Sequence, residues 1–224
     1  RRLLAYSSIA HAGYMMMASS VMLMVTQGDA HKLREISGDI LFYLLVYVFM
    51  NLGAFTVAGM IGLKENTQDI RQYAGLIKRS PMLAVLMVVF LLSLFGMPGL
   101  GGFMGKIFLA SQMFAAGPLG YVLIAILLFN TLLSLAYYLK PGYYMIVATP
   151  GHDAAAKPRW TAGTPATVIL MICAIMLLWT GLFPGSIQRL MHDLGRVDAV
   201  ATGNELSMSP ADATMVISPE SSHE

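Results

Sequence analysis

Residues 92–106 read LSLFGMPGLGGFMGK, and they interrupt an apolar run that extends from Pro81 to Phe114. A continuous helix of that length would measure about 50 Å, whereas the hydrocarbon core of a bilayer is about 30 Å thick. Pro98 lacks a backbone N–H, and the glycines around it lower the cost of irregular backbone. The stretch therefore predicts two half-helices joined by an unwound segment. Irregular backbone at membrane depth is tolerated where protein buries it or where it lines a wet cavity, so we expect the break to be turned away from lipid.

The composition is that of a membrane protein. Of the 224 residues, 57% are hydrophobic and 12% are charged, whereas in a soluble domain about half are apolar and about a quarter charged. We therefore predict an all-α integral membrane protein with five transmembrane helices, of which the third is broken. These five segments are residues 3–25, 40–63, 81–114, 119–139 and 165–183. The net charge of +2 is too small to suggest nucleic acid as a partner.

The two ends of the sequence differ in character. Arg1 stands where an initiator methionine would, and the first apolar segment follows at once, so we interpret the chain as a piece of a longer protein. Residues 1–187 are interpreted as the membrane domain. Residues 188–224 are polar, and from Ala199 onward they are rich in Ser, Pro, Ala and acidic side chains. Such a segment cannot bury enough apolar surface to order itself, which predicts a disordered tail.

The distribution of basic residues predicts the orientation in the membrane. Nine of the 14 lysines and arginines fall on the side of Arg1, four fall on the opposite side, and Lys106 belongs to neither. Because cytoplasmic loops carry the excess of Lys and Arg, we expect the C-terminus on the outer side.

Lys106 follows directly after the break and is surrounded by apolar residues. A lysine near the bilayer centre costs about 2.5–3.5 kcal/mol on insertion scales. An ammonium on a flexible stem beside unwound backbone is typical of a proton-relay station. The alternative is a lysine that snorkels to the membrane interface. The adjacent break favours the relay.

The first apolar segment places Ser7, His11 and Tyr14 on one face of a helix. Histidine exchanges protons near neutral pH through its two ring nitrogens, so this face could belong to a relay. A polar stripe in a membrane bundle can equally join helices by hydrogen bonds, and the sequence leaves the two interpretations open.

Other polar residues within the segments favour simpler interpretations. In the fourth segment, hydrogen bonding between helices is favoured for Asn130, Ser134, Tyr137 and Tyr138, with an aromatic belt as an alternative for the two tyrosines. The same hydrogen bonding is favoured for Asn51, a lone polar residue in the second segment. The fifth segment is only weakly polar, at Thr167, Cys173 and Thr180, and is expected to be a lipid-facing support. Solvated surface positions are expected for His31, His152, His192 and His223.

Motifs for cofactor chemistry are missing from the sequence. It contains no phosphate-binding glycine loop, no dinucleotide fingerprint and no cluster of Cys and His with metal-ligand spacing. We therefore expect this chain to bind no cofactor and no metal.

Two stretches resemble a known family. Residues 1–14, RRLLAYSSIAHAGY, are similar to the start of the tenth helix in the antiporter-like, proton-conducting membrane subunits of bacterial respiratory complex I, the NADH:quinone oxidoreductase. Residues 92–106 resemble the broken twelfth helix of these subunits, and the end of the following helix at Tyr137 also fits. The resemblance covers nearly all of residues 1–184, and its nearest branch is subunit N.

The resemblance implies a fold and a set of site residues. The family has fourteen helices in inverted repeats, so this chain would carry helices ten to fourteen. Lys106 falls on the position of the key lysine of subunit N, where the related subunit M and sodium/proton antiporters usually have glutamate. His11 matches a histidine of the central hydrophilic axis. Supporting roles would fall to Arg1, Ser7, Tyr14, Gly96, Pro98 and Tyr137.

Two positions depart from the family pattern. Arg1 stands where a lysine is common, and because arginine keeps its proton, it could act there only as a fixed charge. Gly99 replaces the more usual second proline of the break, which implies a more flexible segment.

The function implied is that of a proton-translocating subunit in the bacterial plasma membrane, in contact with other membrane-arm subunits and the lipid bilayer. NADH, flavin, iron–sulfur clusters and quinone would belong to partner subunits. Two alternatives remain: a subunit of a sodium/proton antiporter complex on the same scaffold, and a purely structural membrane subunit.

Overall fold

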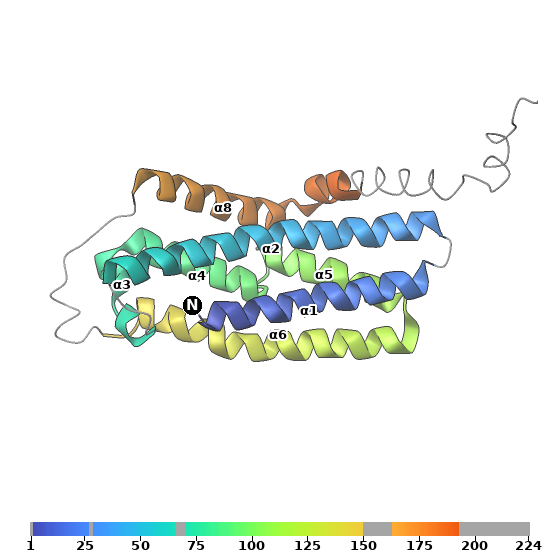
Figure 1. The fold of residues 1–224 in the computed structure, drawn as a ribbon, viewed down its shortest axis with the longest axis horizontal. Coiled ribbons are helices and arrows are strands. Elements are labelled where there is room, and N and C mark those ends of the chain that lie inside the picture. The colour runs from blue at the N-terminus through green and yellow to red at the C-terminus, as the bar shows by residue number, and fades with distance from the viewer. Residues whose placement is uncertain (1, 27–28, 66–69, 150–162, 193–224) are drawn as a thin grey trace, which may run out of the picture.

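The computed structural model describes residues 2–26, 29–65, 70–149 and 163–192. Within these ranges every regular element is a helix, and the helices lie along one axis as an elongated bundle (Figure 1). Four of them, α1, α2, α6 and α8, are long and apolar enough to cross a membrane. The prediction of an all-α membrane protein is confirmed.

The first two helices form an antiparallel pair, α1 (Arg2–Val25) and α2 (Ala30–Glu65). α2 begins well before the expected start at Ile40. The reason is a cap: Oδ1 of Asp29 accepts hydrogen bonds from the backbone N–H groups of His31, at 3.0 Å, and Lys32, at 3.2 Å. A side-chain oxygen that binds the first N–H groups stabilises a helix start. The helix therefore extends through polar sequence that hydropathy assigns to a loop.

The predicted broken span consists of α4 (Pro81–Phe95) and α5 (Gly101–Phe114), which follow each other through the middle of the bundle (Figure 1). α4 ends because Gly96 has a left-handed conformation, with φ of 96°, and Gly99 has a φ of 90°. Glycine adopts this conformation without steric cost and commonly terminates helices. Two short elements, η1 (Ile70–Tyr73) and α3 (Leu76–Arg79), precede α4.

The last two long helices also differ in extent from the sequence prediction. α6 (Gly117–Ile146) continues past the expected end at Leu139 and contains Pro141 in its interior. Membrane helices accept such a proline when neighbouring groups bind the backbone groups it frees. α8 (Thr164–Leu182) matches its prediction closely. Beyond it, residues 184–192 are helical, so the first residues of the predicted tail belong to the folded bundle, and residues 193–224 lie outside the described residues.

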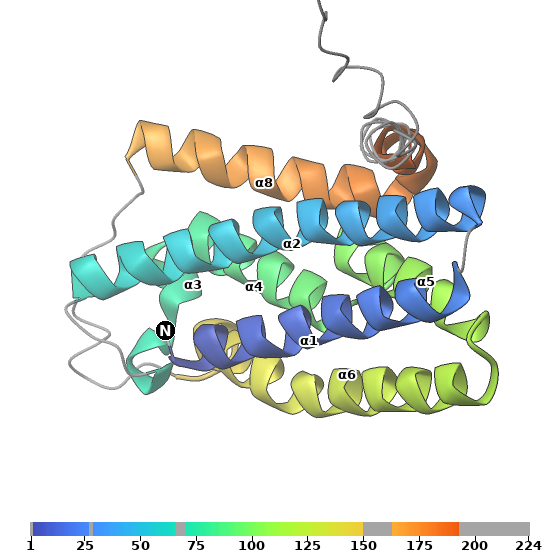
Figure 2. The ribbon, with the colours of Figure 1, turned by 45° about the vertical axis from the view of Figure 1, so that its right-hand side comes forward.

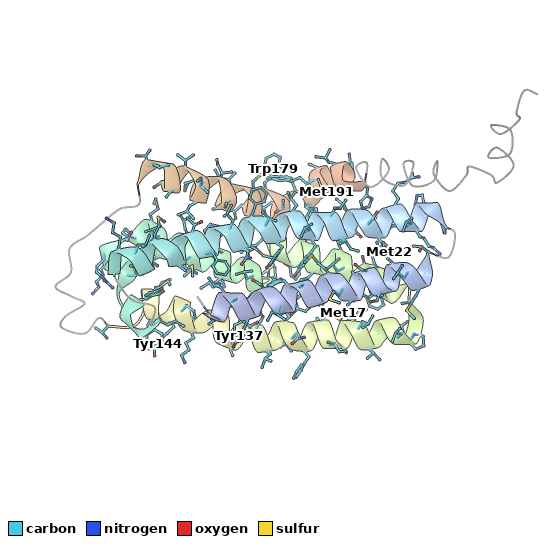
Figure 3. The ribbon with its side chains drawn as sticks, in the orientation of Figure 1. Met17, Met22, Tyr137, Tyr144, Trp179 and Met191 are labelled. Atoms are coloured by element: carbon cyan, nitrogen blue, oxygen red, sulfur yellow. The ribbon has the colours of Figure 1, made fainter. Side chains whose placement is uncertain are left out.

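α2 is the central helix of the bundle. It packs against α1, α4, α5 and α8 (Figure 2), and its buried face includes Phe42, Val46 and Met50. The opposite surfaces of α1, α6 and α8 expose large apolar side chains. Trp179, for example, lies on the outer side of α8 (Figure 3). Apolar outer faces around a packed interior are what a bilayer solvates.

Backbones approach closely around the break. The end of α8 lies against it, because a Cβ on Gly181 would be 2.3 Å from the carbonyl oxygen of Gly99, and one on Gly101 would be 2.1 Å from Oγ1 of the buried Thr180. The prediction that α8 only faces lipid is therefore wrong for its last turn. The break itself is buried at Gly96 and at residues 100–102 but exposed at residues 97–99, so this chain alone covers it only in part.

The close approach at Gly102 makes a testable prediction. A Cβ there would lie 1.9 Å from the carbonyl oxygen of Ser93, which is backbone and cannot rotate away. We expect Gly102→Ala to destabilise the fold by about 1–3 kcal/mol. Gly59 in α2 is the matched control, because a Cβ there meets nothing within 4 Å, and Gly59→Ala should stabilise the helix by about 0.5–1 kcal/mol. Thermal unfolding of the purified protein in detergent measures both, and equal shifts would contradict the packing described.

Candidate functional site

Lys106 lies in the second turn of α5 and is 6% exposed. Its Nζ donates hydrogen bonds to the carbonyl oxygens of Leu94, at 3.1 Å, and Phe95, at 2.6 Å. In an uninterrupted helix these carbonyls would accept from the N–H groups four residues later. Pro98 has no N–H to offer Leu94, and Gly99, the corresponding donor for Phe95, lies in the break. The lysine therefore supplies donors that the end of α4 lacks.

The amine of Lys106 stays inside the bundle, so the snorkelling alternative is wrong. Besides the two carbonyls, Nζ faces the ring of Tyr14, with 5.6 Å to the ring centroid, a cation–π distance. Gly96 permits this arrangement, since a Cβ at that position would be 3.2 Å from Nζ and 3.3 Å from Cδ of the lysine. Tyr14 and Gly96, both singled out from the sequence, thus contact or adjoin the amine.

His11 on α1 is buried, at 2% exposed, and joins two other helices. Its Nδ1 lies 2.6 Å from Oη of Tyr43 on α2. Its Nε2 lies 3.5 Å from Oη of Tyr138 on α6, a long contact, and Tyr138 is hydrogen-bonded to Oγ of Ser7. Hydroxyl groups and a neutral imidazole each both donate and accept. Ser7, Tyr138, His11 and Tyr43 therefore form a row of side chains that can each donate and accept a hydrogen bond, with its longest link between Tyr138 and His11.

The sequence did not lead us to predict a polar stripe on α2. Asp39, Tyr43, Tyr47 and Asn51 follow one another at four-residue intervals, which places them on one helix face. Asn51 is not a lone polar residue, because its Nδ2 donates to Oη of Tyr47 at 3.0 Å. The ring of Tyr47 in turn lies 5.3 Å from that of His11. The four-residue spacing is the signal that could have revealed the stripe.

The structure separates some of the predicted residues from this site. Tyr137, labelled in Figure 3, is half-buried and packs its ring against Tyr138 at 4.6 Å, and Tyr138, its neighbour, makes the contacts to Ser7 and His11. Pro98 is exposed and acts only through its missing N–H. Arg1 lies outside the described residues.

A second polar cluster surrounds Asp39, which is 1% exposed. Its Oδ2 accepts from Nε2 of Gln112 on α5 at 2.7 Å. Its Oδ1 is 3.0 Å from Nε2 of Gln188 and 3.1 Å from Nε2 of His192, both in the helical segment 184–192. His192 is therefore partly solvated, as expected, but it also binds a buried carboxylate, which was not expected. Hydropathy did not predict that Asp39 is buried, because the residue lies at the polar start of α2.

Comparisons with known proteins agree with these features. Residues 1–134 match the family model described as NADH:quinone oxidoreductase/Mrp antiporter, transmembrane. The chain is 40% identical over 187 residues to NADH-quinone oxidoreductase subunit N of Geobacillus sp. (strain WCH70), covering 83% of this chain and 35% of the relative. The corresponding protein of Anoxybacillus flavithermus is 37% identical over 184 residues, which are 82% of this chain and 34% of the relative. The chain thus spans about a third of the length of these curated relatives.

A solved structure extends the comparison to three dimensions. A chain of respiratory complex I from Thermus thermophilus with bound aureothin superposes with a TM-score of 0.64 and 31% identity, over 84% of this chain and 39% of that chain. With the apolar helices described above, the family match identifies a multi-pass protein of the bacterial plasma membrane. The chain belongs to the family of transmembrane subunits shared by NADH:quinone oxidoreductases and Mrp antiporters.

Proposed function

We propose that this chain is the C-terminal part of a proton-translocating membrane-arm subunit of an NADH:quinone oxidoreductase, of the subunit N type. The names of its curated relatives and the buried lysine of the broken helix support this. In this proposal the subunit binds no redox group, and NADH, flavin, iron–sulfur clusters and quinone belong to partner subunits. Redox energy released there reaches this chain as a change of charge in its neighbourhood.

The observation that carries the proposal is the environment of the Lys106 amine. Its partners are two carbonyl oxygens at the C-terminal end of α4 and the face of the Tyr14 ring. A helix C-terminus carries a partial negative charge that favours a cation, so the ammonium is stabilised. No carboxylate with a described side chain forms an ion pair with it. Among the described residues, the ammonium is thus held by backbone dipoles and an aromatic ring and not by an ion pair. In the proposed function, a moderate change in the local field releases its proton.

His11 supplies the connection between Lys106 and the remaining polar groups. Both residues contact Tyr14, the lysine through the ring face and the histidine edge-on, with 5.6 Å between the two ring centroids. From His11 the hydrogen bonds lead to Tyr43 on one side and to Tyr138 and Ser7 on the other. In the proposed function, Lys106 passes protons toward the outer side and His11 links it to the rest of the subunit.

The orientation of the proposal follows the basic residues. The end of α2, α3 and the last turns of α6 lie at the end of the bundle where α1 begins, and the start of α2 and residues 184–192 lie at the opposite end (Figure 1). The described basic residues of the first end are Lys64, Lys78, Arg79 and Lys140, and those of the second end are Lys32, Arg34 and Arg189. With the more basic end in the cytoplasm, the end that holds Asp39 and residues 184–192 faces outward.

Replacement of Lys106 tests the proposed function. In the assembled complex, Lys106→Met removes the amine but keeps an unbranched side chain, and we expect it to abolish most NADH-driven proton pumping and to lower quinone reduction. Lys106→Arg should assemble yet pump poorly, because arginine can bind the carbonyls but does not release its proton. Acidification of membrane vesicles and quinone reduction measure the two effects. Lys140→Met, on the exposed surface of α6, is the control.

Two outcomes would contradict the proposed function and favour one of the alternatives. Normal pumping by the assembled Lys106→Met complex would exclude the relay and fit a structural subunit, for which the loss of a buried charge is silent or stabilising. Sodium-driven proton exchange that needs no NADH would identify an antiporter.

A pair of glycines tests whether the position of the amine matters. Gly96→Ala and Gly99→Ala both place a side chain at positive φ, so their backbone strain is similar. Only the Cβ at Gly96 meets Lys106, since a Cβ at Gly99 has nothing within 4 Å. We expect Gly96→Ala to lose clearly more pumping than Gly99→Ala in complexes assembled to the same level. Equal losses would assign the effect to strain in the break.

A further inference from the structure

Asp39 is the only buried carboxylate among the side chains that the structure describes. It lies on α2 away from Lys106, and Gln112, which binds it, is six residues beyond the lysine on α5, about 9 Å along the helix axis. We propose that Asp39 and His192 form a second proton-binding site, through which protons that leave Lys106 reach the outer surface. This inference rests on the proposed function and adds a location for the exit.

The hydrogen bonds of Asp39 include one to a group that can exchange a proton with it. A carboxylate removed from water is costly unless it is paired or hydrogen-bonded. Neither Gln112 nor Gln188 is charged, and the third partner, His192, is a cation only when protonated. A proton shared by the pair can lie on Oδ1 of Asp39 or on Nε2 of His192, because the bond of 3.1 Å between these atoms can form with either one as the donor.

The two glutamines suit a carboxyl group that changes its protonation state. A permanently ionised anchor is best bound by groups that only donate, such as arginine or backbone N–H. A glutamine amide presents either two donors or an acceptor, depending on the rotation of its end. Gln112 and Gln188 can therefore bind the carboxylate by their N–H groups and the protonated carboxyl by their oxygens, without any movement of the helices.

The pair also spans from the interior to the surface. The side chain of Asp39 is 2% exposed, whereas that of His192 is 29% exposed. The imidazole packs on the backbone of Gly38, where a Cβ would be 2.1 Å from its Cδ2. In the proposed step, Nε2 of His192 takes the proton from Asp39 while Nδ1 gives its proton to the outer medium. The ring is then neutral, in its other tautomer, and Asp39 is ionised. The pair is restored when a proton from the interior reaches Asp39 and the ring returns to its first tautomer.

The polar stripe of α2 leads toward this pair from the interior. Tyr43 is one helical turn from Asp39 on the same face, and its hydroxyl is bound to His11. Asp39 thus continues the relay that the proposed function places around Lys106 and His11.

The groups that could titrate near the pair are few. On α2, Glu35 and Tyr43 lie one turn before and after Asp39, with Arg34 beside Glu35. α5 presents the neutral Gln112, and the facing part of α1, around Ala18 and Val21, is apolar. The segment 184–192 contributes His192, Gln188 and the exposed Arg189.

The test uses the assembled complex in proteoliposomes with Asp39→Asn. Because the glutamine amides can rotate to suit the new amide, this variant keeps the hydrogen bonds, and the complex should melt at the same temperature. We expect NADH-driven pumping to fall about tenfold or more, in line with the loss of a positioned proton-transferring group. Asp39→Glu should restore part of it. Glu35→Gln is the control. It removes a carboxylate one helical turn away that does not bind Asp39, and this variant should pump normally.

His192→Gln tests the pair independently of Asp39 and keeps the proposal testable should Asp39→Asn fail to assemble. Its pumping should fall about tenfold or more, because a glutamine amide can bind Asp39 but cannot take up its proton. A merely structural role would leave the pumping rate of a stably assembled variant unchanged. Normal pumping at every pH by either variant would overturn the inference. Lys106→Met in the same assay separates the two ideas, because the proposed function fails only if that variant also pumps normally.

Discussion

The interaction on which the rest of the structure depends is the binding of the Lys106 amine to the last carbonyls of α4. A break in a membrane helix leaves acceptors without donors, and a lysine in a membrane needs acceptors. Here the lysine supplies the missing donors and the free carbonyls supply its acceptors, through hydrogen bonds of 3.1 Å to Leu94 and 2.6 Å to Phe95. The glycines that surround the break then let α2, α5 and α8 approach closely enough to bury the pair. Much of the architecture therefore keeps the helix break and the buried lysine, each unfavourable alone, in contact with each other.

A common principle governs the polar groups of the interior. The described partners of Lys106, His11 and Asp39 are carbonyls, hydroxyls, amides and one imidazole, and none carries a permanent charge. Strong ion pairs would hold each proton in one place. Neutral partners can form hydrogen bonds with both protonation states, and the network remains packed whichever state is present. Stability and proton mobility are therefore compatible in the same set of contacts.

Part of this arrangement can be predicted from short stretches of sequence, and part depends on contacts between distant residues. The break and the lysine were predictable, because a proline among glycines within an overlong apolar run has a local physical meaning, and His11 was singled out by helix spacing. Tyr137 was singled out by the resemblance, whereas the structure brings its neighbour Tyr138 to His11. Neighbours on a helix differ by about 100° in direction, and only packing decides which one faces inward. Asp39 and His192 are far apart in the sequence. Each looks like an ordinary polar residue at the edge of an apolar segment until the fold brings them together.

Pro98 has a consequence that a list of contacts does not reveal. The residue is exposed, and it has no N–H with which to bind the carbonyl of Leu94, to which Lys106 donates. What matters at this position is therefore an atom that is missing. Any other amino acid would bring an N–H that, if the helix continued past Gly96, would compete with the lysine for this oxygen. Judged by its exposed surroundings alone, position 98 would tolerate many amino acids. Its choice of amino acid is nevertheless constrained, because the residue there must not contribute an N–H.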